Sequence, residues 1–520
     1  MLGTEVNNYQ SAITVYSRKL SLVWKSIFVG IIAGVVVTLY RLLLIQTEEA
    51  SKAVYRFFTG HLALVPLLFA GLGLLGYLTG LLAKRYKAIG GSGIPQVKGI
   101  LLGSFQAPWL STLMAKFFGG AATILAGLSL GREGPSIQLG GCVAQGMAEK
   151  LADSRTEKRI LIASGASAGL AAAFNAPLAG AMFAMEEIFK YISPLVFLST
   201  AASAIASDFV SKLVFGMAPV FSFSTPLTIP LSGYWLLLLL GVMLGVAGSL
   251  YNVALIKTIA LYKRPVWLKP AFRLVIPFVL AGVLAFVFPS ALGSGHAILD
   301  SLSLSTPIYT LLIILIVKFL FSMISFSSGA PGGIFFPLLI LGGTAGAVVG
   351  HLACAAGLNP VLFDNFIIIA MAGYFTAIVR APLTGVVLLL EMTGSFQNLL
   401  PLMAVSLAAF VTADLLHSKP IYDSLLENLL GGQLHESREA EAGKTTLEIP
   451  VHFDSSADGK LVRNLGLPKD CLLIAIRREG KDLIPKGDTQ VLAEDSVVFL
   501  INQKDEAAYR EMLTALTEYQ

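Results

Sequence analysis

The chain has 520 residues, of which 55% are hydrophobic and only 13% are charged. Its mean hydropathy is +0.76. Soluble domains carry about 25% charged residues, so this composition excludes an ordinary soluble protein and indicates a chain embedded in lipid. The net charge of +5 is small for the length, and it gives no reason to expect a nucleic-acid partner.

The N-terminal segment precedes the first apolar run. Its 25 residues are polar. They are too long for the positively charged start of a signal peptide, and no small-residue cleavage site comes after them. Arg18, Lys19 and Lys25 stand directly before the apolar residues. Positive residues concentrate on the cytosolic side of membrane spans, so the N-terminus is expected in the cytosol.

Two kinds of apolar stretch occur along the chain. Runs with few or no charges cover residues 26–40, 62–82, 192–215, 232–256, 270–292, 307–317 and 398–413. Several approach or exceed the ~20 residues that cross a bilayer. Other apolar stretches are short and interrupted by Gly and Pro, at 131–148, 165–187, 329–350 and 371–394. Broken helices are tolerated at membrane depth only where protein or a water-filled cavity shields their backbone, so these stretches predict a permeation site.

The sequence repeats itself. Lys116-Phe117 recurs as Lys318-Phe319, an offset of 318 − 116 = 202, and at this offset Gly131, Pro135, Leu139 and Gly140-Gly141 meet Gly333, Pro337, Leu341 and Gly342-Gly343. Ala176-Pro177-Leu178-Ala179-Gly180 matches Ala381-Pro382-Leu383-Thr384-Gly385 at an offset of 205, and Glu186 and Glu391 stand ten residues beyond each alanine. We therefore expect two homologous halves, about 22–215 and 230–420. If each half crosses the membrane an odd number of times, the halves are inverted and both chain ends lie on one side.

Three Gly/Pro segments interrupt the apolar sequence: Gly91-Ser92-Gly93-Ile94-Pro95, Gly131-Arg132-Glu133-Gly134-Pro135 and Gly332-Gly333-Ile334-Phe335-Phe336-Pro337. In each, glycines permit unusual backbone angles and a proline stands where a first helical turn accepts it. Each segment therefore predicts a helix start. Helix starts present unpaired N–H groups and partial positive charge, which suits an anion. Three starts aimed at one point would hold an anion loosely enough for release.

These segments resemble the signature motifs of the CLC chloride channels and transporters. The resemblance extends to Lys116-Phe117-Phe118-Gly119-Gly120, Asn175-Ala176-Pro177-Leu178-Ala179-Gly180, Arg380-Ala381-Pro382-Leu383-Thr384-Gly385 and Lys419-Pro420-Ile421-Tyr422, and it covers about residues 20–430. It implies an all-α polytopic membrane protein made of two inverted repeats with broken helices. The motif set is specific, because no other family known to us combines these segments in this order.

The resemblance also implies an anion site. Ser92 and Tyr422 would offer hydroxyl groups to a central anion, and the backbone N–H groups of Ile334 and Phe335 would complete the site, with Gly93 beside Ser92. A serine in the first motif is similar to chloride-selective members, whereas nitrate-preferring members carry proline there. Chloride is therefore the expected substrate.

Glu133 is the expected gating glutamate. A carboxylate at a helix start in an anion pathway is itself an anion, so it competes with chloride until a proton neutralises it. Arg132 would add positive potential beside it, and Gly134 supports the same turn. The alternative is a plain capping acid.

Glu187 is the expected second proton residue, because it matches the internal proton glutamate of the family. Intramembrane carboxylates often belong to proton relays, and channel-type members usually lack a glutamate here. The alternative is an ion-pair or rim residue. The neighbouring Glu186 shares its position with Glu391 in the repeat, which suggests a structural role for both. Lys116 either adds positive potential to the pathway or is a buried structural partner, and Gln96 replaces a glutamate frequent after the first motif.

The composition changes after the transmembrane domain of residues 1–430. Residues 431–445 are polar and charged, as in a linker, and residues 446–520 form a small α/β soluble domain. Strand patterns occur at Thr446–Pro450, Leu472–Arg477 and Val497–Ile501, and an amphipathic helix pattern occurs at Ala507–Leu516. Asp488-Thr489-Gln490-Val491-Leu492 and the following Asp495-Ser496-Val497-Val498 resemble the TrkA-C (RCK-C) module of potassium-conductance regulators. Such modules bind small ligands or dimerise, or they are packing appendages.

No cofactor is expected. No Gly-rich dinucleotide fingerprint is present, so neither NAD nor ATP binding is predicted. Cys142, Cys354 and Cys471 follow no metal-ligand spacing and are expected to be isolated packing residues. The sequence shows no nucleophile–base constellation, so it gives no indication of an enzyme.

The sequence therefore predicts a homodimeric exchanger of two Cl⁻ for one H⁺ in the cell (inner) membrane, with both termini cytosolic. The dimer and the stoichiometry rest on the resemblance. The lack of paired CBS domains, which eukaryotic members commonly carry, indicates the prokaryotic type. The alternatives are a passive voltage- or pH-gated chloride channel of the same fold and a ligand-responsive sensor in which the C-terminal module dominates.

Overall fold

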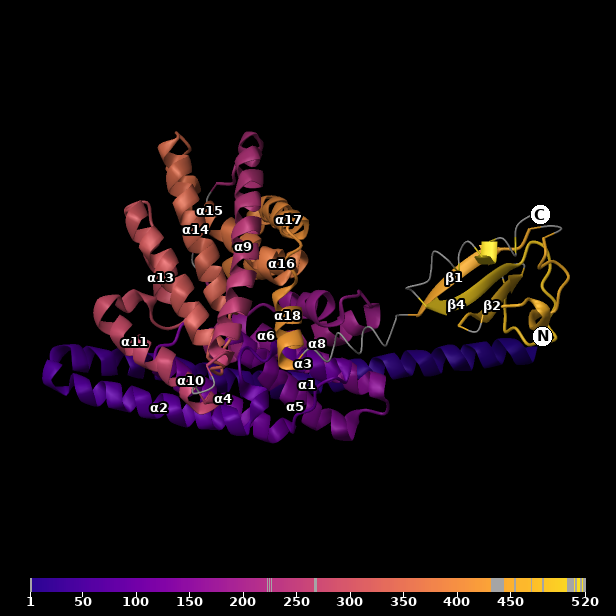
Figure 1. Ribbon diagram of the computed structural model, residues 1–520, viewed down its shortest axis with the longest axis horizontal. Helices are drawn as coiled ribbons and strands as arrows, with labels where there is room; N and C mark the ends of the chain where they lie inside the picture. Colours follow the sequence, from indigo (N-terminus) through magenta and orange to yellow (C-terminus); the bar gives the residue numbers. More distant parts are fainter. Residues whose placement is uncertain are drawn as a thin grey trace. The chain divides into compact units, whose positions relative to one another are not determined.

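The computed structural model describes residues 2–221, 223, 225, 227–265, 269–431, 444–452, 455–468, 470–478, 481–502, 509, 512–514 and 517. The chain divides into two compact units, Met1–Leu426 and Glu427–Gln520. The described part of the first unit is helical and that of the second contains a sheet (Figure 1).

The first unit contains two series of helices. The first half comprises α1 (Leu2–Gly60), α2 (Val65–Arg85), α3 (Ile94–Leu102), α4 (Trp109–Leu125), α5 (Glu133–Leu151), α6 (Arg155–Phe174), α7 (Pro177–Phe183) and α8 (Pro194–Phe215), with a π-helical turn, η3 (Ala184–Phe189), after α7. The second half comprises α9 (Tyr234–Lys263), α10 (Pro270–Arg273), α11 (Val275–Val287), α12 (His296–Ser301), α13 (Ile308–Ser327), α14 (Phe335–Ala355), α15 (Phe363–Val379), α16 (Pro382–Thr393) and α17 (Leu399–Leu415), and α18 (Ile421–Leu429) comes after them.

Nine helices of the described chain are long and apolar enough to cross a membrane. Seven of them correspond to the predicted apolar runs. Of the other two, Phe335–Ala355 falls largely in a stretch expected to be broken, and Pro360–Val379 overlaps one only at residues 371–379. The glycines of residues 329–333 precede α14 rather than interrupt it, and Pro337 stands in its first turn, where no intrahelical N–H is needed. The break expected in the stretch 371–394 occurs at Arg380, between α15 and α16. Arg380 has left-handed backbone angles, which end α15.

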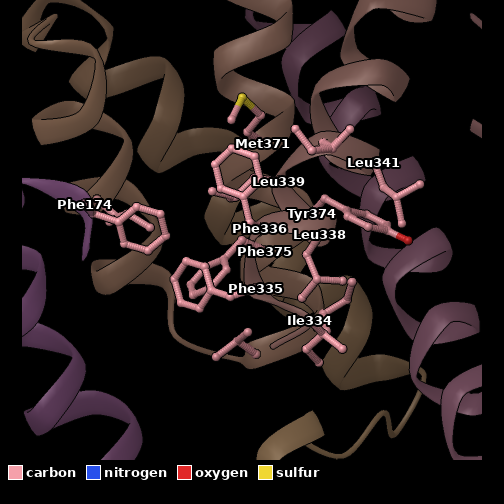
Figure 2. Packing of buried hydrophobic residues seen from close by; sticks show 14 of the residues in the cluster. Phe174, Ile334, Phe335, Phe336, Leu338, Leu339, Leu341, Met371, Tyr374 and Phe375 are labelled. Atoms are coloured by element: carbon pink, nitrogen blue, oxygen red, sulfur yellow. The ribbon is translucent and has the colours of Figure 1, made fainter. Parts of the chain in front are cut away.

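The core of this unit is densest where the two halves meet at the start of α14. The Phe335 ring lies 5.2 Å from that of Phe174 at the end of α6, and 4.7 Å from that of Phe375 in α15. Figure 2 shows this packing. All three side chains are buried, so an aromatic cluster fixes where α14 begins.

The predicted repeat appears in the structure as two equivalent lysine contacts. Lys116 Nζ donates hydrogen bonds to the carbonyls of Ile89 (2.8 Å) and Gly91 (2.6 Å). Lys318 Nζ does the same to Ala291 (3.0 Å) and Gly293 (2.7 Å), each 202 positions further on. Both side chains are fully buried, and a buried ammonium needs such partners. Lys116 is therefore a structural partner of the loop before α3.

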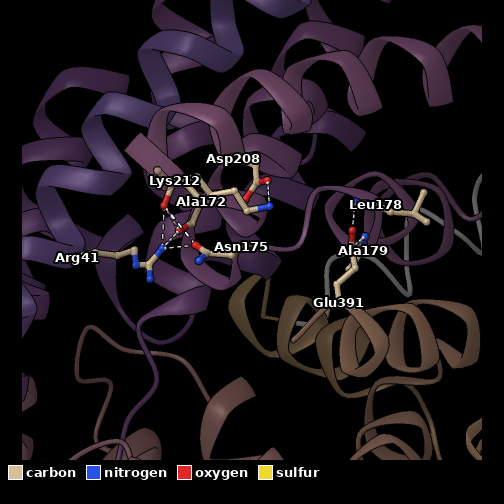
Figure 3. Close-up of polar contacts among 9 residues, drawn as sticks. Arg41, Ala172, Asn175, Leu178, Ala179, Asp208, Lys212 and Glu391 are labelled. Carbon is tan, nitrogen blue, oxygen red and sulfur yellow. Dashed lines mark hydrogen bonds and ion pairs between the residues drawn. The ribbon is translucent and has the colours of Figure 1, made fainter. Parts of the chain in front are cut away.

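A second pair of equivalent contacts links the halves to each other. Glu186 accepts hydrogen bonds from the N–H groups of Leu383 (3.1 Å) and Thr384 (2.7 Å) at the start of α16. Glu391, near the end of α16, accepts them from Leu178 (3.0 Å) and Ala179 (2.8 Å) at the start of α7, as Figure 3 shows. Because each half caps a helix of the other, the halves are related by an approximate two-fold axis, as in an inverted repeat. This supports the expected structural role of both glutamates.

The repeat also extends beyond the part recognised in the sequence. Gly91-Ser92-Gly93 recurs as Gly293-Ser294-Gly295, again at an offset of 202. Gly91 and Gly93 have φ of 69° and 94°, and Gly293 and Gly295 have φ of 66° and 106°. These left-handed angles require glycine, so the loops before α3 and α12 are copies in conformation as well as in sequence.

A buried arginine holds the break between α6 and α7. Arg41 of α1 donates hydrogen bonds to Asn175 Oδ1 (2.8 Å), Ser211 Oγ (2.8 Å) and the carbonyl of Ala172, and its guanidinium lies 4.0 Å from the centre of the Phe215 ring. Asn175 is the left-handed residue that ends α6. Figure 3 shows this cluster. Its contacts fix the position of the motif that leads to Glu186 and Glu187.

The second unit contains an antiparallel sheet of four strands in the order β1-β4-β2-β3. The strands are β1 (Lys444–Pro450), β2 (Leu472–Arg478), β3 (Lys481–Leu483) and β4 (Ser496–Asn502). Three of them confirm the predicted strands. β3 was not predicted, because three residues are too few for an alternating pattern. Of the predicted linker, residues 432–443 lie outside the described residues, as does most of the predicted helix Ala507–Leu516, of which only Tyr509 and Met512–Thr514 are described.

Side chains at the strand ends of this sheet are paired. The Ser496 hydroxyl and the Arg477 guanidinium both bond to Glu448, and they hold the pKa of that carboxyl below its ordinary value. Across both units the three cysteines are free and isolated, as expected.

The cap that Glu391 provides gives a stability prediction. In Glu391→Ala the N–H groups of Leu178 and Ala179 lose their partner, so we expect the free energy of unfolding to fall by about 1–3 kcal/mol. Thermal denaturation of the purified protein in detergent measures the change. Glu49→Ala is the control, since Glu49 is an exposed partner of Lys52, and such changes usually stay within about 0.5 kcal/mol. Equal melting temperatures for the two variants would contradict the assignment.

Candidate functional site

The three Gly/Pro segments meet in one backbone junction. The N–H of Gly131 donates to the carbonyl of Gly333 (2.7 Å), and the N–H of Gly333 donates back to Gly131 (2.8 Å). The N–H of Gly91 donates to Ala330 (3.1 Å), and that of Gly332 donates to the carbonyl of Gly91 (3.1 Å). The structure thus brings the starts of α3, α5 and α14 together. We call residues 91–93, 131–134 and 330–334 the three-loop junction.

Close approach explains two of the junction's glycines. A Cβ on Gly134 would lie 2.6 Å from the carbonyl oxygen of Ser92, and one on Gly333 would lie 3.2 Å from the N atom of Gly134. A side chain at position 134 would therefore push the first turn of α5 away from Ser92. The junction is tight enough that its geometry depends on these two positions having no Cβ.

The helix starts at the junction carry unpaired backbone donors. α14 begins at Phe335 with Ile334 as its N-cap, and the first N–H groups of any helix have no partner within that helix. Phe335 and Phe336 are fully buried, and Figure 2 shows the apolar side chains around them. The partial positive charge at this helix start therefore lies in dry surroundings, where it acts most strongly on an anion.

Two hydroxyl groups expected at the anion site are buried. Ser92 is 1% exposed, and its Oγ accepts only a long hydrogen bond, 3.3 Å, from the N–H of Ile94. The fully buried Tyr422 Oη has no hydrogen-bond partner among the described residues. Buried polar groups are normally paired, so the unpaired phenol is available as a hydrogen-bond donor.

Glu133, the first residue of α5, is fully buried. Neither carboxylate oxygen has a hydrogen-bond partner among the described residues, and Arg132 Nε is 4.0 Å away. A Cβ placed on Gly131 would meet both Glu133 Oε2 (2.3 Å) and the N atom of Phe336 (3.1 Å). The carboxylate therefore lies next to the donors at the start of α14, in the place that suits an anion.

Glu187 lies in η3 and is 2% exposed. Its Oε1 accepts a hydrogen bond of 2.8 Å from Lys98 Nζ. Lys98 is also paired with Asp423, and Asp423 with Lys190. Glu187 is a buried carboxylate. The ion pair given in the sequence analysis as the alternative to a proton role is also present. Sequence analysis missed Lys98 and Asp423. The signal was a lysine inside a short apolar helix, which is costly unless it is paired.

A cavity of about 510 Å³ adjoins Glu187. Its polar lining includes Glu186, Glu187, Lys190, Arg380 and Asp414. The inner carboxylate therefore borders an opening in the membrane unit. The buried Tyr422 phenol interacts electrostatically with both Glu187 and Glu133.

The remaining predicted residues support the junction. Lys116 bonds to the backbone carbonyls of the loop before α3 and does not reach the anion ligands. Gln96 is buried, and its Nε2 donates to the carbonyl of Gly90 (2.6 Å), which holds the same loop. Arg132 is the N-cap residue of α5 and adds a positive charge beside Glu133.

The fold and this arrangement define a polytopic membrane protein with an inverted repeat, whose broken helices begin around a buried polar site. Residues 75–414 match the family model described as "Voltage gated chloride channel", and residues 446–514 match that of the TrkA-C domain. The chain belongs to the voltage gated chloride channel family. Both resemblances seen in the sequence are thereby confirmed.

Known relatives are similar over most of their length. The H(+)/Cl(−) exchange transporter ClcA of Citrobacter koseri is 35% identical over 419 residues, which cover 78% of this chain and 86% of that protein. ClcA of Salmonella gallinarum is 35% identical over 443 residues, covering 80% and 92%. The crystal structure of a slow cyanobacterial Cl⁻/H⁺ antiporter superposes with a TM-score of 0.74 at 29% identity, over 80% of this chain and 99% of that one. A CLC-type fluoride/proton antiporter, at 23% identity and a TM-score of 0.64 over 78% and 97%, shares the fold.

Proposed function

We propose that this protein is a secondary active transporter that exchanges chloride for protons across the cell membrane, with two Cl⁻ for each H⁺. The observation that carries the proposal is a pair of buried carboxylates: Glu133 lies unpaired among anion-binding donors, and Glu187 borders a polar cavity. The names of the ClcA relatives describe this exchange.

Chloride binds where the helix starts and hydroxyl groups converge. The N–H groups of Ile334 and Phe335 and the hydroxyl groups of Ser92 and Tyr422 are donors without full charge. They offset part of the anion's dehydration cost, and they bind it weakly enough for transport. Gly93, which has a φ of 94°, provides the turn that places Ser92 ahead of α3.

Glu133 couples the anion to the proton. Its ionised carboxylate occupies donors that chloride also needs, and the two negative charges exclude each other in a low-dielectric site. A proton neutralises the side chain, which then leaves the donors to chloride. Chloride binding and proton binding therefore favour one another at this position.

Glu187 passes protons between the interior and the cavity. It is buried enough to exclude free water, yet it borders the cavity of about 510 Å³. A passive channel of the same fold needs no carboxylate at this position. The presence of Glu187 therefore favours an exchanger.

The assembly and orientation form the remaining part of the proposal. The protein is a homodimer with one pathway per subunit, in the inner membrane, with both termini cytosolic. Lys25, near the start of the first span, supports this orientation through the positive-inside rule. The TrkA-C domain binds a small ligand or mediates dimerisation. If the domain instead governed the protein as a sensor, deleting residues 431–520 would abolish regulated flux.

Replacing the gating carboxylate removes proton control. We expect Glu133→Gln to conduct chloride but to lose the dependence of that flux on pH. The amide stays neutral at every pH, so it does not compete with chloride for the donors. Chloride efflux from liposomes, recorded over a pH series, measures this. Glu49→Gln, an exposed substitution on α1, serves as the control. Retention of the wild-type pH dependence in Glu133→Gln would count against the gating role.

Replacing the inner carboxylate uncouples the two ions. We expect Glu187→Gln to stop proton uptake driven by a chloride gradient, while chloride continues to pass, since the anion ligands are intact. Simultaneous recording with a chloride electrode and a pH electrode gives the H⁺/Cl⁻ ratio. A ratio equal to that of the wild type would show that Glu187 is not the proton residue.

The reversal potential separates an exchanger from a channel. Each 2:1 cycle moves three elementary charges, of which one is a proton. A tenfold proton gradient, about 59 mV for a single charge, therefore moves the reversal potential by a third of that, about 20 mV. The measurement is made on the full chain in a planar bilayer at equal chloride on both sides. A reversal potential that ignores the pH gradient would identify a channel.

A further inference from the structure

The exchange proposed for Glu133 and Glu187 assigns no role to a buried lysine next to Glu187. Lys98 lies inside α3, with a side chain only 5% exposed, and its Nζ is 2.8 Å from Oε1 of Glu187. The Glu187 side chain is 2% exposed. Solvent therefore screens this ion pair very little, and each charge strongly affects the other.

Lys98 is shared between two carboxylates. Its second partner is Asp423, whose side chain is 23% exposed and which also pairs with the more exposed Lys190. Four alternating charges thus lead from Glu187 to Lys190, and both of these residues line the cavity of about 510 Å³. The network connects α3, α18 and the end of η3.

This sharing makes protonation of Glu187 possible without leaving a buried charge alone. An ammonium beside a carboxylate favours the ionised carboxylate. Removal of one partner from a buried pair normally leaves an uncompensated charge. When Glu187 takes up a proton, however, Lys98 keeps Asp423 as its partner, so its own charge stays compensated.

We propose that Lys98 is a positioning residue that sets the pH at which Glu187 accepts a proton and holds that carboxylate at the edge of the cavity. The proposal rests on the proposed role of Glu187 in proton transfer. In this proposal Asp423 opposes the effect of Lys98 on Glu187, since the Asp423 carboxylate competes with Glu187 for the same ammonium.

The other charged groups near Glu187 are accounted for. The cavity brings Arg380 from the end of α15 and Asp414 from α17, which pair with each other. The Glu186 carboxylate accepts hydrogen bonds from backbone N–H groups at the start of α16. Helices α6, α7 and α8 pack on η3. Helix α7 has no titratable side chain, and the titratable side chains of α6 all lie in its first five residues. In α8, Asp208 and Lys212 pair with each other. Two phenols complete the surroundings: Tyr422, which interacts electrostatically with Glu187, and Tyr191, which lines the cavity.

The experiment titrates Glu187 itself. Infrared spectra of the full chain in lipid are recorded over a pH series, and the carboxyl stretch that Glu187→Gln removes is followed. We expect Lys98→Met to shift this titration to higher pH by about 1–3 units. Lys98→Arg keeps the charge and should retain the wild-type titration. Asp423→Asn removes a negative neighbour and leaves Lys98 to Glu187 alone, so the titration should move to lower pH.

Controls separate this role from a purely structural one. Lys212→Met also removes a membrane lysine from an ion pair with a carboxylate, and it should leave the titration unchanged. A general loss of packing cannot shift the titration in opposite directions in Lys98→Met and Asp423→Asn. If Lys98→Met fails to fold, as judged by size-exclusion chromatography, the shift in Asp423→Asn still decides.

The possible results are distinct. Opposite shifts in Lys98→Met and Asp423→Asn, with wild-type behaviour in Lys98→Arg, support the proposal. An unchanged titration in Lys98→Met, or in Asp423→Asn, overturns it. Parallel measurement of proton uptake by Glu187→Gln tests the underlying function separately, because proton uptake that survives there removes the proton role of Glu187 whatever the titration of the wild-type carboxylate shows.

Discussion

The unpaired N–H groups at the starts of α5 and α14 are the constraint on which the rest of this structure depends. A membrane offers them no water, so each must find a partner inside the protein. Gly131 and Gly333, each two residues before its helix, join the two starts by exchanging two backbone hydrogen bonds. That exchange is possible only if the two halves meet through equivalent residues. The donors at the start of α14 lie in dry surroundings, which is why the proposed function assigns a small anion to them.

The two buried carboxylates of the first half show how burial can be used in opposite ways. Glu133 has no hydrogen-bond partner among the described residues, so its charge is stabilised only by nearby dipoles and by Arg132. Glu187 has a full ammonium at 2.8 Å. A carboxylate without such partners suits the proposed group that alternates with chloride. Glu187 is held in place, which suits a group that receives protons from the cavity at a fixed position.

Local features of the sequence predicted most of the fold and much of the site. Apolar runs gave the spans, and glycine followed by proline gave the helix starts, because both signals lie within a few residues. The contacts of Lys98 did not emerge, since its partners Glu187 and Asp423 are 89 and 325 positions away. The motif comparison singles out Gln96, two residues earlier, whose side chain bonds to the carbonyl of Gly90 in the loop before α3. No local pattern shows which distant carboxylate a buried lysine meets.

The repeat supplies a nearly symmetric scaffold, yet the two proposed proton residues and Lys98 lie in one half only. The lysines at 116 and 318 and the Gly-Ser-Gly loops are preserved in both copies. At the same offset of 202, however, Glu133 corresponds to Phe335 and Lys98 to Asp300, and at the offset of 205 Glu187 corresponds to Met392. The lysines and the pair Glu186 and Glu391, which bond to backbone groups, have therefore stayed equivalent. Glu133, Lys98 and Glu187 have no counterpart of the same type in the second half. An exact two-fold repeat would place the same charged groups in both halves, so the differences at these positions are what make Glu133 and Glu187 particular to the first half.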